Sequence, residues 1–220
     1  MSSISATAIF RRIFVLVRES WGLLAAAILV LTAVGIAADI SGSAGLAGLA
    51  IVSTGIGVMA QLVVTRNLVT RTGLVTEGRP RKGLWTVLGV SLLYGFGVAL
   101  GTCLLVLPGV YVFVRWFAAI PAALAEALDP AEALTRSWNM TKGSEGAVLL
   151  VGVAVYAPML FALFLLGFFS PQVEASVPQV GTSAVSNLVV YGPTVIGWYA
   201  AVAVYDLLQP SGRRLETVFA

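Results

Sequence analysis

The chain has 220 residues, of which 59% are hydrophobic and only 10% are charged, and its net charge is +3. Soluble domains carry about 25% charged residues, so these few charges cannot cover the surface of a water-soluble fold of this size. The composition therefore excludes a soluble globular protein and indicates one that is surrounded mainly by lipid.

The residue types that the chain lacks exclude several kinds of site. It has no histidine and a single cysteine, Cys103, which excludes intramolecular disulfides, histidine-ligated haem and the usual zinc sites. Cys103 lies in an apolar run, and we interpret it as a small buried hydrophobic residue. No stripe of basic residues with interleaved aromatics indicates nucleic-acid binding. We therefore expect no cofactor, no metal and no nucleic-acid partner.

The N-terminal segment has the pattern of an amphipathic helix. In IFRRIFVLVR the apolar residues that share one helical face are Ile9, Phe10, Ile13, Phe14 and Val17. This pattern predicts a helix over about 9–18 that lies in the membrane interface; the alternative is the solvated start of the first span. No cleavage site follows a short apolar core, so we expect no removable signal peptide.

Six hydrophobic stretches follow, each near the ~20 residues that cross a hydrocarbon core. We place these spans at about 20–38, 46–65, 84–105, 110–128, 146–169 and 184–205. The third and fourth come from one uncharged run, 83–114, which we divide at Pro108–Gly109 because a Pro-Gly pair is typical of a turn. Pro121 then interrupts the fourth span. The sequence thus predicts an all-α, polytopic membrane helix bundle that forms a single domain over residues 1–220.

The segment DPAEALTRSWNMTKG, residues 129–143, predicts a separate short helix. Asp129 is a good N-cap, Pro130 suits the first helical position, and Glu132 completes a capping box. Lys142 and Gly143 suit the C-terminal end. The narrow apolar face consists of Leu134, Trp138 and Thr141. Because such a helix cannot span, we expect residues 130–141 to lie at the cytoplasmic surface.

The basic residues predict the orientation. In the six-span arrangement twelve of the thirteen Lys and Arg residues fall on one side, and Arg115 is the exception. The loops on the opposite side contain only Asp39 and Glu174 as charged residues. By the positive-inside rule both termini are cytoplasmic.

Arg115 is the basic residue within an apolar run, where a charge at the centre of a lone span costs roughly 2.5–3.5 kcal/mol. Counted from Val110 at 1.5 Å per residue, it lies about 8 Å below the outer surface. There it can extend outward or meet Asp39 or Glu174. Three roles stay open: a structural anchor, which we favour, part of a polar cavity, or a ligand site. Glu126 is about 16 Å further along the same helical face, too far to pair with Arg115 within one straight helix.

Small residues in two spans indicate close helix packing. Gly97 and Gly101 form a GxxxG motif, and Gly55 and Gly57 are small positions in the second span. Packing within the chain is favoured over dimerisation.

We find no catalytic constellation. Asp129 and Glu132 are explained by helix capping, and with Glu126 they lie at a membrane edge. The chain shows no phosphate-binding loop, no serine nucleophile with a base, and no metal cluster. We therefore expect that the protein is not an enzyme.

Residues 107–143 resemble the YciC-like bacterial integral membrane proteins, which are related to the membrane domain that precedes some glycerophosphoryl diester phosphodiesterases. The residues that carry the resemblance are Pro108, Gly109, Arg115, Pro121, Glu126, Ala133, Arg136, Ser137, Lys142 and Gly143. The resemblance implies a six-span protein of the bacterial inner membrane. It implies no phosphodiesterase activity, because in such fusions that chemistry belongs to a separate soluble domain.

Together these observations predict a non-catalytic membrane protein with a scaffold or envelope-associated role. One alternative is a small transporter or lipid-handling protein in which Arg115 engages an anionic group. Another is an accessory subunit of a larger membrane complex. The expected partners are membrane lipids and, in the last alternative, other membrane-protein subunits.

Overall fold

The computed structural model describes residues 4–41, 46–76, 83–173 and 179–209. In these ranges the chain is helical, and its nine helices are α1 (Ala6–Glu19), α2 (Trp21–Ile40), α3 (Leu46–Arg71), α4 (Leu84–Leu104), α5 (Val106–Arg115), α6 (Ala119–Glu126), α7 (Pro130–Met140), α8 (Glu145–Val173) and α9 (Gln179–Leu208). Six stretches are long and apolar enough to cross a membrane, with α5 and α6 together forming one of them. The prediction of an all-α membrane helix bundle is confirmed.

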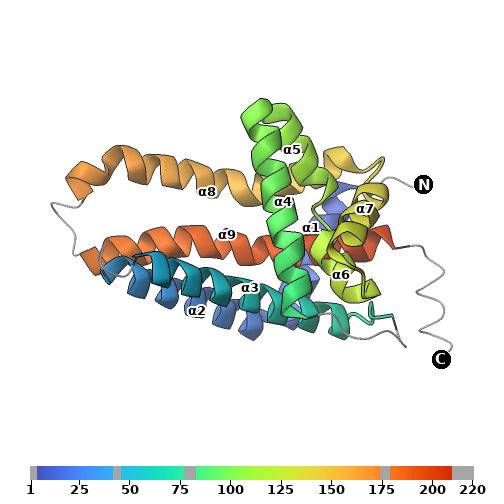
Figure 1. The fold of residues 1–220 in the computed structure, drawn as a ribbon, viewed down its shortest axis with the longest axis horizontal. Coiled ribbons are helices and arrows are strands. Elements are labelled where there is room, and N and C mark those ends of the chain that lie inside the picture. The colour runs from blue at the N-terminus through green and yellow to red at the C-terminus, as the bar shows by residue number, and fades with distance from the viewer. Residues whose placement is uncertain (1–3, 42–45, 77–82, 174–178, 210–220) are drawn as a thin grey trace.

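Four helices of the bundle run in one common direction, and two run across it. Helices α2, α3, α8 and α9 run along the long axis of the molecule, whereas α4 and α5 run across it (Figure 1). Helices α1, α6 and α7 gather where α9 ends, and we call this the α7 end. The start of α3 and the end of α2 lie at the opposite end (Figure 1).

Helix α9 forms the centre of the core, and it is hydrogen-bonded to α2 near both ends of α2. Near the α7 end, the Tyr199 hydroxyl lies 3.0 Å from Ser20 Oγ, and Tyr199 is fully buried. At the opposite end, Asp39 accepts hydrogen bonds from Ser183 Oγ and, at 2.8 Å, from Asn187 Nδ2. Tyr199, Ser20 and Ser183 are buried, and a buried polar group that lacks a partner in an apolar setting is costly. Asp39 is therefore a link between two helices.

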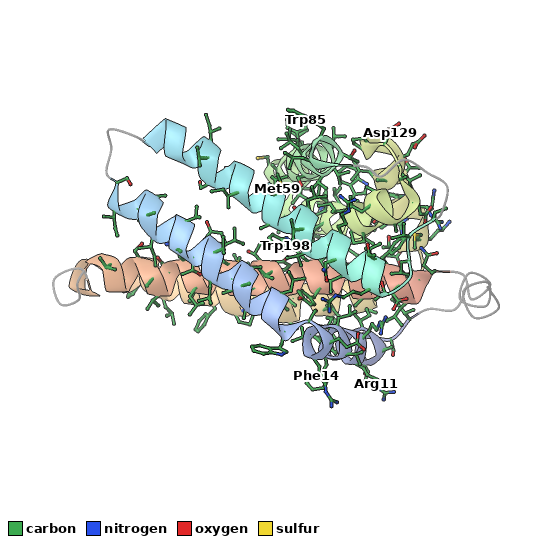
Figure 2. All side chains as sticks on the ribbon, turned by 90° about the horizontal axis from the view of Figure 1, so that it is seen from below. Arg11, Phe14, Met59, Trp85, Asp129 and Trp198 are labelled. Atoms are coloured by element: carbon green, nitrogen blue, oxygen red, sulfur yellow. The ribbon has the colours of Figure 1, made fainter. Side chains whose placement is uncertain are left out.

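Helix α1 packs on the bundle with part of its apolar face. Ile9, Ile13 and Leu16 are buried against the core. Phe10 and Phe14, which belong to the predicted apolar face, are exposed, Phe14 to 67%, and Figure 2 shows Phe14 and Arg11 pointing away from the bundle. Helix α1 packs against α9 and α8 with one edge of its apolar face, and the other edge faces outward. The two phenylalanines remain available to lipid.

The turn between α4 and α5 lies at Leu105 (φ −164°, ψ 144°), and the next helix starts at Val106. The predicted turn at Pro108–Gly109 and the predicted start at Val110 are therefore wrong. Pro108 is the third residue of α5, where a backbone N–H would have no partner within the helix, so proline is tolerated there. The motif is typical of turns, but the extended backbone of Leu105 had already reversed the chain.

The hairpin is tight because two glycines face each other. A Cβ built on Gly101 would lie 2.8 Å from Gly109 Cα, and a Cβ on Gly97 would lie 2.1 Å from the Trp116 ring. The packing role predicted for Gly97 and Gly101 is confirmed. It is wrong for Gly55 and Gly57, which have nothing within 4 Å of such a Cβ. Cys103 is exposed on this hairpin rather than buried.

The chain breaks again between α5 and α6, over residues 116–118. Pro121 explains the break, because without an N–H it cannot bond the carbonyl of Phe117 four residues earlier. It lies in the first turn of α6, where it is buried. The predicted interruption by Pro121 is thus found just before the proline.

Candidate functional site

Arg115 lies at the last position of α5, and only 2% of it is exposed. Its Nη1 donates a hydrogen bond to Glu145 Oε1 at 2.7 Å, and Glu145 is the first residue of α8. The expected partner Asp39 is wrong, since it bonds α9 at the opposite end of the bundle; Glu174 lies outside the described residues. Because the chain reverses direction at Leu105, Arg115 lies beside the start of α8.

Aromatic rings enclose the Arg115 guanidinium. Its Cζ lies 4.7 Å from the centroid of the Trp138 ring and 5.8 Å from that of Tyr111. The two rings meet edge to face at 5.5 Å. A desolvated cation over an indole gains about 2 kcal/mol, so the rings offset part of the cost of burying the charge. The Arg115 Nε is buried and has no hydrogen-bond acceptor among the described residues.

Ser137 joins α7 to the break between α5 and α6. Its hydroxyl donates to the Arg115 carbonyl at 2.9 Å and accepts from the Ala118 N–H at 3.2 Å. Thr141 Oγ1 also donates to the Arg115 carbonyl, at 3.2 Å. These are backbone groups that the ends of helices leave without partners inside the helix. A buried hydroxyl that donates and accepts at once therefore holds the break in place.

Helix α7 is the predicted short helix, and Asp129 and Glu132 form the predicted capping box, with the Asp129 N–H donating to Glu132 Oε2 at 3.2 Å. Leu134 and Thr141 are buried, and Trp138 is half-buried against the bundle.

The turn after α7 places Glu145. Gly143 has a left-handed φ of +85°, as predicted, and its N–H donates to Glu145 Oε2 at 2.8 Å. The other carboxylate oxygen is the one that Arg115 contacts. Lys142, which directly precedes Gly143, is exposed. The geometry thus gives Gly143 a positioning role for the Arg115 pair.

Glu126 belongs to a second buried cluster. It accepts hydrogen bonds from Arg136 Nε at 3.0 and 3.1 Å, from the Tyr205 hydroxyl at 2.8 Å and from Gln209 Nε2 at 3.5 Å. Arg115 and Glu126 have separate partners, in agreement with the prediction that they do not pair. Glu126 links α6, α7 and α9, which holds the α7 end together.

An open groove of about 430 Å³ lies beside this cluster, between α6 and α7. Its polar lining comes from Glu126, Glu132, Thr135, Arg136 and Asn139. Two of its charged groups already pair with each other, and a third completes the capping box. Most of the exposed lining of the groove is apolar, and its charged groups are largely engaged with one another.

Several residues of the two clusters were not predicted. Glu145 and Tyr205 have sequence signals that could have identified them: an acid at the first position of a helix, and a tyrosine at the end of an apolar span. A third ion pair, Arg12 Nε to Asp206 Oδ2 at 2.5 Å, joins α1 to α9. It links residues 194 positions apart, a separation that no local pattern reveals.

Eight residues of the segment 107–143 are the candidate structural or ligand-contact residues: Pro108, Gly109, Arg115, Pro121, Glu126, Ser137, Lys142 and Gly143. The structure brings five of them into the two clusters or their immediate support: Arg115, Glu126, Ser137, Gly143 and, through the break, Pro121. Pro108 and Gly109 serve the α4–α5 hairpin, and Lys142 lies on the surface. Within the described ranges no three His, Cys, Asp or Glu side chains converge as metal ligands. In comparisons with known proteins, no family model, curated protein or solved structure matches the chain.

Proposed function

We propose that the protein is a non-catalytic, multi-pass component of the bacterial inner membrane with a scaffold or envelope-associated role. The observation that carries this proposal is that charged side chains near the α7 end form ion pairs between helices of the same chain. Arg115, Glu126 and Arg12 are each engaged with an opposite charge of the same chain. A binding or catalytic site requires groups that are free to meet a ligand, whereas these groups connect helices.

The orientation in this proposal has both termini in the cytoplasm. Arg18 and Arg71, like Lys142, lie toward the α7 end, and Arg71 donates to the carbonyl of Glu19 across two helix ends. At the opposite end the charged residue within the described ranges is the acid Asp39. This distribution supports a cytoplasmic α7 end by the positive-inside rule.

The relationship to the YciC-like membrane proteins is also part of the proposal. It draws support from where the resembling residues lie: Ser137 bonds the backbone of Arg115, and Arg136 pairs with Glu126. Several of the residues that carry the resemblance thus contact one another. Residues 107–143 form a structural unit, as a resemblance confined to this segment would imply.

One observation favours the alternative of lipid handling or transport. The Arg115 Nε is buried without an acceptor among the described residues, so an anionic group that reached it would gain a charge-assisted hydrogen bond. Against this, Nη1 already pairs with Glu145 and the side chain is almost fully covered.

The proposal can be tested on protein extracted from native membranes in lipid-containing discs and analysed by native mass spectrometry. A scaffold is expected to retain partner proteins, and Arg115→Lys is expected to leave the bound small molecules unchanged. A saturable anionic lipid that is present on the wild type and lost from Arg115→Lys would refute the scaffold role and support the alternative. Reporter fusions after Ser43 and after Val177 test the orientation, and a cytoplasmic signal from either one contradicts it.

A further inference from the structure

The α4–α5 hairpin runs across the helices that surround it. In Figure 1, α4 stands across α8 and α9, and in Figure 2, turned by 90°, the coil beside Trp85 is viewed along its axis while α2, α3 and α9 extend lengthwise. Helices that cross one bilayer all pass from one surface to the other. The four lengthwise helices and a transverse hairpin cannot all do so.

The backbone of Arg115 shows the depth at which the hairpin lies. Arg115 is the tenth of the 21 residues of the apolar stretch Val106–Glu126. If that stretch crossed the membrane, Arg115 would lie about 15 Å from either end at 1.5 Å per residue, in the middle of a core about 30 Å thick. Its carbonyl is instead 2.9 Å from Ser137 Oγ of α7. Helix α7 exposes Glu132, Thr135 and Asn139, a polar face that requires water.

The first arm of the hairpin lies at the same level. A Cβ on Gly89 of α4 would be 2.8 Å from the Pro130 ring at the start of α7. Gly97, near the middle of α4, contacts Trp116, whose ring is 6.4 Å from that of Trp138. Helix α4 therefore follows the polar helix α7 along much of its length.

The tip of the hairpin is suited to lipid and unsuited to water. Leu104, Leu105, Val106 and Leu107 are 78%, 69%, 66% and 81% exposed, and they are consecutive. A spanning hairpin would place this tip in water at the opposite surface, at a cost of about 25 cal/mol per Å² of apolar area. The turn also satisfies its own backbone, since the Leu105 N–H bonds the Gly101 carbonyl at 3.0 Å. Such closure is what backbone in hydrocarbon requires.

From these contacts we propose that the α4–α5 hairpin lies within the membrane leaflet at the α7 end, and that the acyl chains of that leaflet are the partner of its exposed tip. The inference rests on the proposed membrane location and concerns the depth of two apolar stretches. Both termini remain on the same side. The hairpin and the exposed phenylalanines of α1 then displace lipid from one leaflet only.

Fluorescence quenching in one leaflet at a time tests this proposal on the full chain. A bimane fluorophore is attached to Leu107→Cys in a Cys103→Ala background, both positions being exposed. Spin-labelled lipid is then exchanged into the accessible leaflet of inside-out or right-side-out vesicles. Control fluorophores at Asn139→Cys and Ser41→Cys, on exposed residues of α7 and of the opposite end, report the two surfaces.

We expect the fluorophore at position 107 to lose most of its emission in inside-out vesicles and little in right-side-out vesicles, like Asn139→Cys. A pattern that matches Ser41→Cys means that the hairpin crosses, which overturns the proposal. Quenching from neither leaflet means that protein covers the tip, which overturns lipid as its partner. If the two controls report the same leaflet, the proposed orientation fails, an outcome distinct from failure of the hairpin alone.

Discussion

Removal of the Ser137 hydroxyl tests whether the break between α5 and α6 depends on α7. Ser137→Ala leaves the Arg115 carbonyl with its bond from Thr141 Oγ1, at 3.2 Å. It leaves the Ala118 N–H, whose residue is fully buried, without its acceptor. One buried, unsatisfied backbone group costs about 1–3 kcal/mol. We therefore expect the free energy of unfolding to fall by about 2 kcal/mol, roughly a thirtyfold change in the equilibrium constant.

The matched control is Thr135→Ala on the same helix. Its hydroxyl donates to the Ala131 carbonyl at 2.9 Å and is exposed, so a change within about 0.5 kcal/mol is expected. Equilibrium unfolding in mixed micelles of increasing dodecyl sulfate fraction, followed by circular dichroism, measures both variants. Equal stability of the two would refute the bridging role of Ser137. In addition, Thr141→Val should cost more in the Ser137→Ala background than alone, because the carbonyl then loses both donors.

Five further substitutions probe other contacts with the same unfolding measurement. Arg115→Lys keeps the charge but loses the contact of the guanidinium with the indole ring, so we expect a loss of about 0.5–2 kcal/mol; Glu145→Gln should cost more, because it leaves the buried Arg115 without its counter-charge, and the reverse order would contradict this. Gly109→Ala places a Cβ 2.1 Å from a threonine oxygen and should destabilise by about 1–3 kcal/mol, whereas Gly57→Ala should be tolerated; equal effects would count against the tight hairpin. Asp129→Ala should cost about 1 kcal/mol through the lost cap, and an unchanged stability would show that the capping box contributes nothing.

Local features could be predicted from the sequence because their causes are local. The capping box at Asp129, the left-handed turn at Gly143 and the break caused by Pro121 each depend on a few neighbouring residues. The partner of Arg115 could not be predicted, because it depends on where the chain reverses. Counting from a turn at Pro108–Gly109 placed Arg115 near Asp39, at the wrong end of the bundle, and the actual turn at Leu105 has no sequence signal.

Which side of a helix packs against the bundle was harder to predict than where the helix lies in the sequence. The heptad-like spacing in α1 identified an amphipathic helix, but Phe14 and Ile13 both satisfy that pattern, and only packing against α9 separates them. The same limit applies to Gly57 and Gly101, which have equal propensity for close packing. What distinguishes them is the presence of a facing backbone, and that depends on contacts far along the chain.

The hydrogen bonds between α2 and α9 have a consequence for biogenesis. Asp39 and Ser20 belong to α2 and its N-terminal cap, while their partners Asn187 and Tyr199 belong to α9, which follows the other described helices in the chain. The ion pair of Arg12 with Asp206 imposes the same delay on α1. These polar groups of α1 and α2 must therefore wait, incompletely matched, until α9 has been synthesised. The bundle closes only when α9 meets α1 and α2.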